Sequence, residues 1–535
     1  MSAVVMTTRM RPSLGDAVSS LLAGDFEDAL DRCDALDRQG EGAPEVASLR
    51  ARALLRLDRC SEALEVLGFT GAEGPTSDAD PMRRMLIGVA LTRSGDAERG
   101  LEHLRRIRPV VECSHASIRS EVALSIGLAH YALRHLDSAE AALDEVNVED
   151  DVVYARSLEY KGWIACARGS HHEGAAMFVA ALTKLEHCKA YDRFLEANCL
   201  QALAHLAVDG LDRQAWQAVS VRRARVRWDA KGLGHLLFRL SMSTATFQND
   251  VEGQPMEAAV EARRAYEIAP TPAYRIQALC KRASIARSAG ERIAQNDHVQ
   301  AAVDAFRTLN VSALSADERI VSLTIAEELA NAGRPSEARS HLDAYCRDRP
   351  AIGTLAIGGD PRRETYEQLV AGQVAEAEAA RSEATSLYRR VLKKSMKSSL
   401  RHGVIAAIRL ADVAGDTSYL RGYAALAARE VRESSWIHES LKRMSSMDTL
   451  GSLTAPQSEC LTMMSRGYTN SQIAHARGRS VNTVRNQVST LFELFGVRNR
   501  AQLIGAYLHS SRTNSSRGAS FAGSGGVTGR RRFSD

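Results

Sequence analysis

Four polar residues near the C-terminal end of the chain recur at the spacing of one helix face. They are Asn482, Arg485, Asn486 and Ser489. The other side carries an apolar stripe at i, i+4, i+7 and i+11, formed by Val484, Val488, Leu491 and Phe495. Arginine suits the guanine edge and asparagine the adenine edge of a base pair in the major groove of DNA. The pattern predicts a helix with a buried back and a front that reads bases.

The residues before this stretch predict where the neighbouring helices begin. Thr454 with Gln457, and Thr469 with Gln472, have the spacing of capping boxes. Ser480 is placed to cap the helix that begins at the next residue.

Glycines and small residues predict where these helices end and how they turn. Gly467 and Gly496 are expected to end two helices in the left-handed conformation. Ala474, Gly478 and Val484 fall at the fifth, ninth and fifteenth places of a helix-turn-helix frame. Alanine lets the two helices approach, glycine takes the turn and valine packs inward.

Residues 453–508 resemble the LuxR-type (NarL/FixJ-like) DNA-binding domain. The matching residues are Leu453, Thr454, Glu459, Leu461, Gly467, Thr469, Asn470, Ile473, Ala474, Ser480, Thr483, Val484, Gly496, Val497, Asn499 and Arg500. The resemblance implies a transcription regulator that binds double-stranded DNA. It places Arg485, Asn486 and Ser489 against bases, and Asn470, Thr483 and Gln487 near phosphates.

A fourth helix is expected over residues 501–508, where the family often has a dimer contact. Leu503, Ile504 and Tyr507 fall at i, i+1 and i+4. Part of this stripe must pack on the third helix. We expect a homodimer on DNA, because one recognition helix reaches too few base pairs to select one operator.

Two arginines depart from the family pattern on either side of the turn. Arg477 and Arg479 stand where apolar residues are usual. We expect their stems to cover the core while their charged ends reach phosphates. The alternative is a domain that no longer binds specific DNA, which leaves a helical repeat interaction scaffold.

Charge separates the two ends of the chain. Residues 453–535 carry 11 Lys and Arg against 3 acidic residues, whereas residues 1–452 carry 58 against 62. A basic end on a mildly acidic body favours a polyanionic partner for that end.

The long body shows a repeating phrase of a small residue, several polar residues, an alanine and an apolar stripe. Its anchors are Ala29, Ala63, Gly100, Ala139, Gly174, Ala215, Ala258, Gln295, Ala338, Ala384 and Leu420. Twelve residues earlier stand Ala17, Ala51, Gly88, Gly127, Gly162, Leu203, Thr246, Ala283, Ala326, Gly372 and Ile408. Small residues facing each other would let paired helices approach, and each pair would be covered by the next.

This phrase resembles the tetratricopeptide repeat, although the early Trp and closing Pro of that family are mostly missing. It implies an all-α solenoid, and the alternative is an irregular helical array. The chain as a whole also resembles the C-terminal part of MalT-like regulators, without their ATPase module.

The sequence shows no motif that predicts a catalytic site. No phosphate-cradling loop is present, and the nine cysteines form no Cys-x-x-Cys pair. We therefore expect no enzyme activity, no metal and no cofactor. A protein, peptide or small-molecule effector in the repeat groove is the expected signal.

The expected organisation has five parts. They are a disordered N-terminus (1–13), a helical repeat domain (14–444), a linker (445–452), a helix-turn-helix domain (453–509) and a disordered basic tail (510–535). No apolar run is long enough to span a membrane, and no signal peptide is apparent, so we expect a cytoplasmic protein.

Overall fold

The computed structural model describes residues 13–507, apart from 41–43, 70–79, 113–114, 150, 227–230, 316–317, 348–360, 452, 496, 498 and 506. Helices connected by short turns make up this described part, which contains no strand, so the all-α prediction is confirmed. The predicted basic tail, Gly496, Leu508 and all of the predicted N-terminal segment except Ser13 lie outside the described residues.

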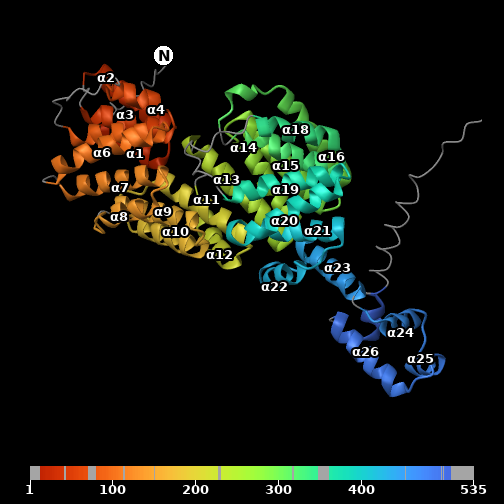
Figure 1. Ribbon diagram of the computed structural model, residues 1–535. Coiled ribbons are helices and arrows are strands. Elements are labelled where there is room, and N and C mark those ends of the chain that lie inside the picture. The colour runs from red at the N-terminus through yellow and green to blue at the C-terminus, as the bar shows by residue number, and fades with distance from the viewer. Residues whose placement is uncertain are drawn as a thin grey trace, which may run out of the picture. The chain divides into compact units, whose positions relative to one another are not determined.

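Consecutive helices of the body form pairs (Figure 1). The first helices are α1 (Leu14–Ala23), α3 (Pro44–Arg56), α5 (Pro81–Arg93), α7 (Ala116–Ala132), α9 (Asp151–Ala167), α11 (Arg193–Gly210), α13 (Gly234–Phe247), α15 (Pro272–Ser288), α17 (Ile320–Asn331) and α19 (Pro361–Ala377). The second helices are α2 (Phe26–Arg38), α4 (Cys60–Val66), α6 (Ala97–Val111), α8 (Leu136–Asp144), α10 (His171–Glu186), α12 (Arg213–Arg223), α14 (Pro255–Ile268), α16 (Arg292–Arg307), α18 (Pro335–Arg347) and α20 (Arg381–Ser398). Helices α21 (Leu400–Ala414) and α22 (Leu420–Glu430) follow them in the sequence.

Short irregular turns of helix occur between some of these elements. They are the 3-10 helices η1 (Lys231–Leu233) and η3 (Val311–Ala313), and the π-helix η2 (Gln248–Glu252).

The predicted repeat register holds in every pair. Each anchor from Ala29 to Ala384 lies on a different second helix, and the residue twelve places earlier lies on the first helix of the same pair. Leu420 is the first residue of α22, and Ile408 lies on α21. The first helices of neighbouring pairs also contact each other. Helix α5 contacts α7, and α7 contacts α9. This regularity favours a true repeat over an irregular helical array.

Small residues set the close approach of the paired helices. A Cβ atom on Gly100 of α6 would lie 2.8 Å from the carbonyl oxygen of Gly88 on α5. A Cβ atom on Gly174 of α10 would lie 2.9 Å from the carbonyl oxygen of Gly162 on α9. Both distances are shorter than real Cβ contacts, so these crossings accept only glycine. The predicted small-residue packing is confirmed at these pairs.

Replacing Gly100 with alanine should therefore destabilise the body. The new methyl group would meet backbone of α5, which cannot rotate away, so we expect a loss of about 1–3 kcal/mol in unfolding free energy. Gly15→Ala is the control, because at that exposed position in α1 the added Cβ would meet, among the described residues, only Ser13 Oγ at 3.6 Å. Denaturant unfolding followed by circular dichroism measures both. Equal midpoints for the two variants would contradict this packing.

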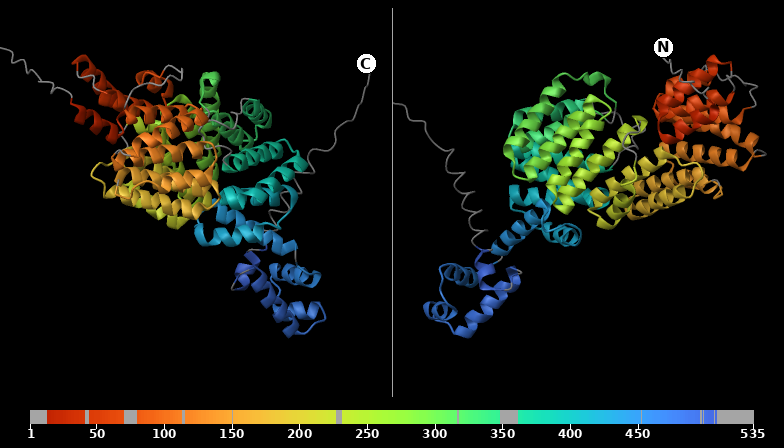
Figure 2. Two further views of the ribbon diagram at one scale, coloured as in Figure 1. Left: turned by 60° about the vertical axis from the view of Figure 1, so that its left-hand side comes forward. Right: turned by 180° about the vertical axis from the view of Figure 1, so that it is seen from behind.

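Contacts divide the described chain into two compact units. The first holds the residues up to Ala406 together with Glu430–Ser435, and the second holds Ala407–Arg429 and the residues from Trp436 onward. Figure 2 shows the stacked helix pairs of the first unit from two further sides.

Helices far apart in the sequence meet within the first unit. Arg56, the last residue of α3, donates from Nη2 to Asp192 Oδ2 at 3.0 Å. Its guanidinium carbon lies 4.1 Å from the ring centroid of Phe194 in α11, and that ring lies 5.9 Å from the ring of Phe26. The Gly232–Gly234 segment, which reads as an inter-repeat loop, packs here as well, because a Cβ on Gly232 would collide with the Gly24 carbonyl oxygen. Residues of α2 and α3 therefore lie against the start of α11.

A second long-range contact anchors Glu430–Ser435 on the π-helix η2. The backbone N–H of Arg432 donates to the Val251 carbonyl oxygen at 2.8 Å, and Ser434 Oγ donates to the Glu252 carbonyl oxygen at 3.0 Å. The Glu252 carboxylate also pairs with Arg213 at 3.0 Å and with Arg432 at 3.1 Å. This short segment therefore belongs to the first unit although its neighbours in sequence do not.

The predicted linker is helical in the structure. Helix α23 (Trp436–Gly451) includes all of it except residue 452, which is outside the described part. The helix can continue because neither Gly nor Pro stands between Trp436 and Leu450. The predicted domain boundaries at 444 and 453 stay a prediction. No helix among the described residues is long and apolar enough to cross a membrane.

Candidate nucleic-acid interface

Three short helices follow α23 and begin where the caps predict. They are α24 (Ala455–Ser465), α25 (Asn470–Ala476) and α26 (Val481–Phe495). Gln457 Oε1 accepts from the Thr454 backbone N–H at 2.9 Å, and Gln472 Oε1 accepts from that of Thr469 at 2.8 Å. Ser480 Oγ accepts from the backbone N–H of Thr483 at 3.1 Å. All three predicted caps are confirmed.

Two glycines take the left-handed conformation at the ends of α24 and α25. Gly467 has φ +89° and Gly478 has φ +58°. After Gly478 the Arg479 N–H donates back to the Ala474 carbonyl oxygen at 2.9 Å, which closes the turn of the helix-turn-helix.

The predicted apolar stripe of α26 forms the core of this domain. Val484 and Leu491 are fully buried and Val488 is 6% exposed, while Phe495 is half-buried. They pack with α24 and α25 through Cys460, Leu461, Met464, Ile473 and Ala474. Burial of one face fixes which residues of α26 face outward.

The outward face of α26 presents the four residues predicted to read bases. Asn482, Arg485, Asn486 and Ser489 are all exposed. Arg485 Nη1 donates a long hydrogen bond to Asn482 Oδ1 at 3.5 Å. The structure thus gathers these side chains on one surface.

The residues predicted near phosphates divide into exposed and engaged groups. Thr483 and Arg479 are exposed. The Thr483 hydroxyl lies 2.8 Å from that of Ser480. Asn470 and Gln487 are half-buried, and each accepts a hydrogen bond from an arginine.

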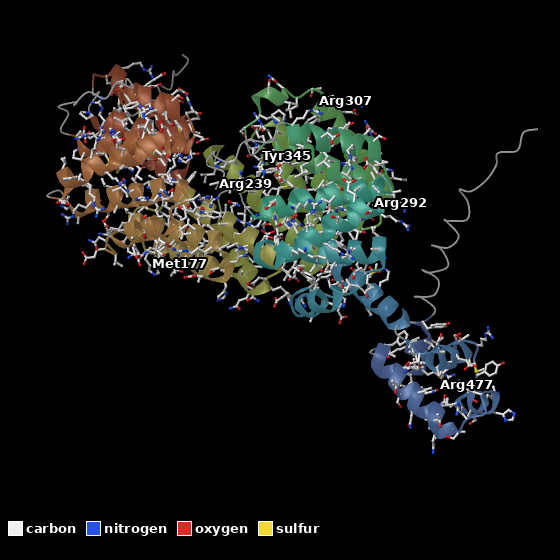
Figure 3. The ribbon with its side chains drawn as sticks, viewed as in Figure 1. Met177, Arg239, Arg292, Arg307, Tyr345 and Arg477 are labelled. Atoms are coloured by element: carbon white, nitrogen blue, oxygen red, sulfur yellow. The ribbon has the colours of Figure 1, made fainter. Side chains whose placement is uncertain are left out.

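Arg477 is not placed for the phosphate contact predicted for it. Its side chain, labelled in Figure 3, is only 8% exposed. Its Nε lies 3.0 Å from Glu459 Oε2 on α24. Its Nη1 donates to Gln487 Oε1 at 2.8 Å. A guanidinium at the junction of three helices finds a carboxylate within reach, so its charge is neutralised inside the domain. Burial raises the pKa of the neighbouring Cys460 thiol, and the positive charge of Arg477 offsets part of this rise.

Comparison with known proteins agrees with this geometry. Residues 451–506 match the family described as bacterial regulatory proteins, luxR family. Those residues form a LuxR-family domain. The chain is also 40% identical over 65 residues to the probable transcriptional regulatory protein SgaR of Hyphomicrobium methylovorum. The aligned residues make up 12% of this chain. The match spans 31% of the length of that relative.

The solved structures that the comparison found share little sequence identity with this chain. Human IFIT1 is 14% identical, with 82% of this chain and 91% of that chain covered and a TM-score of 0.32. Yeast Tom70 is 13% identical, with 82% and 96% covered and a TM-score of 0.29.

One residue predicted as a dimer contact, in the fourth helix of the LuxR-family domain, is buried within the domain instead. Residues 501–505 and Tyr507 are helical. Leu503 is fully buried in the core of the domain, so its side chain is not available to a partner. Ile504 and Tyr507 are half-buried, and the Tyr507 hydroxyl lies 3.2 Å from Thr462 Oγ1. The domain is small, and it needs the apolar side of this helix to complete its own core.

Arg500 is a further residue of the LuxR-family domain to which residue types alone assigned no role. Its Nη1 donates to Asn470 Oδ1 at 3.0 Å, and its Nη2 donates to the Tyr468 carbonyl oxygen. It therefore joins the start of the fourth helix to the start of α25. The matching Asn499-Arg500 pair was the only signal for it in the sequence.

Proposed function

We propose that this protein is a transcription regulator that binds operator DNA through its LuxR-family domain. The observation that carries the proposal is the surface of α26, where Asn482, Arg485, Asn486 and Ser489 are exposed opposite a buried apolar stripe. Side chains of these types at the front of a recognition helix distinguish base pairs in the major groove. Similarity to a transcriptional regulatory protein supports the same function.

The repeat body has a separate role in this proposal. It receives a signal, in the form of a protein, peptide or small-molecule effector, and the protein acts in the cytoplasm as a homodimer on DNA. Stacked helix pairs support this role because they build extended surfaces that suit a partner.

A repeat scaffold without DNA binding is the competing function. The size of the body favours it, since the helix pairs from α1 to α20 in the described part of the chain all precede the LuxR-family domain. The two functions differ in what the exposed face of α26 does.

Binding of the full-length protein to a pool of randomised duplexes tests the proposal. We expect enrichment of a defined sequence, and an affinity that falls steeply as salt rises. Recovery of duplexes without any preference, at the affinity of unrelated DNA, would favour the scaffold.

A further inference from the structure

Two amide side chains of the LuxR-family domain accept a hydrogen bond from an arginine of the same domain. Arg477 Nη1 lies 2.8 Å from Gln487 Oε1, and Arg500 Nη1 lies 3.0 Å from Asn470 Oδ1. Both amides belong to the set predicted near phosphates. The two pairs come from different elements, so the same arrangement is built twice.

The chemistry of the arginine fixes which way each amide points. A guanidinium carries only donors, whereas an amide has an accepting oxygen and a donating NH2 group. The oxygen of Gln487 must therefore face Arg477, and the oxygen of Asn470 must face Arg500. The NH2 groups are left to point elsewhere. Within the part of the chain that the structure describes, neither amide nitrogen donates a hydrogen bond.

Each arginine is itself held from a second side. Arg477 also pairs with Glu459 through Nε at 3.0 Å, and Arg500 also donates to the Tyr468 carbonyl oxygen. With two anchors the guanidinium plane cannot rotate freely. The amide orientation is thus set before any ligand arrives, which lowers the ordering cost of binding.

We propose that Arg477 and Arg500 are positioning residues that turn the NH2 groups of Gln487 and Asn470 toward backbone phosphates of DNA. A phosphate oxygen only accepts, so an amide that presents its NH2 group has the correct polarity and one that presents its oxygen does not. The inference rests on the proposed function. It also gives Arg477 an indirect role in place of the direct phosphate contact that its charge suggests.

Isosteric substitutions test the polarity directly. Gln487→Glu and Asn470→Asp keep an oxygen for the arginine but replace the NH2 group with a second oxygen. We expect full-length variants with unchanged melting temperatures and an affinity at least about tenfold lower, on selected and unrelated duplexes alike. Gln457→Glu is the matched control. It adds the same charge to the domain while keeping the capping box with Thr454, and its affinity should stay within about twofold of wild type.

A double-mutant cycle separates positioning from direct contact. If Arg477 acts through Gln487, then Arg477→Met combined with Gln487→Ala weakens binding no more than Gln487→Ala alone. The slope of log affinity against log salt should also be unchanged by Arg477→Met. A direct phosphate contact by Arg477 would instead give additive losses and lower that slope by about 0.9.

The possible outcomes have distinct meanings. Absence of duplex binding by both wild type and Gln457→Glu would overturn the proposed function, and this inference with it. Wild-type affinity in Gln487→Glu and Asn470→Asp, with wild type binding normally, would overturn the inference alone. Should Arg477→Met fail to fold, Gln487→Glu still decides, because it retains the arginine.

Discussion

Replacing Arg485 or Asn486 with alanine should remove most of the sequence preference of the protein. Both side chains are exposed on α26, opposite the buried Val484 and Val488. Each lost base contact is expected to cost about 1–3 kcal/mol of discrimination, roughly 5- to 150-fold. The quantity to measure is the ratio of the dissociation constants for selected and unrelated duplexes, at one salt concentration.

Arg466→Ala is the control for the lost charge. Arg466 is exposed at the C-terminal end of α24 and is not part of α26. Its removal should weaken binding to both duplexes slightly and leave their ratio unchanged. If Arg485→Ala and Asn486→Ala behave in the same way as this control, then α26 does not read bases.

Local signals explain why the C-terminal helices were predictable. A capping box spans four residues, and an apolar stripe is read within one helix, so Thr454, Thr469 and Val484 could be interpreted without knowledge of the fold. The repeat register was predictable for a related reason. Paired helices joined by a short turn bring together residues at a fixed separation, such as Gly88 and Gly100.

Contacts between distant residues were not predictable in this way. Arg477 was expected at a phosphate because its charge is visible in the sequence, but its partner Glu459 lies 18 residues away on another helix. Leu503 was expected at a dimer interface because its helix is apolar on one side. Whether such a residue is buried depends on how much core the rest of a small domain supplies.

The body shows the same limit on a larger scale. Gly232 looked like part of a loop, yet it lies against the Gly24 backbone. No pattern in the sequence indicated that the segment Glu430–Ser435 is fixed to η2 by backbone and side-chain hydrogen bonds. Both contacts join residues far apart in the sequence. Such contacts depend on the curvature of a solenoid, which is the sum of many small rotations between pairs.

Loss of one half-site from the selected duplex should weaken binding by about two to three orders of magnitude. One recognition helix reads only a few base pairs, so we predict two copies that read half-sites about one helical turn apart. Specific binding typically exceeds unrelated binding by about 10³- to 10⁷-fold. When two copies share this difference, scrambling one half-site removes a large part of it.

The buried Leu503 shapes how the two copies are expected to meet. Of the predicted contacts only Ile504 and Tyr507 keep exposed surface, and one short helix buries far less than the roughly 1,600 Å² of a standard interface. We therefore expect weak association in the absence of DNA and two chains per duplex in its presence, measured by sedimentation. Ile504→Asp should lower the affinity for the two-half-site duplex but not for a single half-site. One chain per selected duplex, or a footprint without two-fold symmetry, would rule out this arrangement, because a symmetric dimer must protect two related sequences.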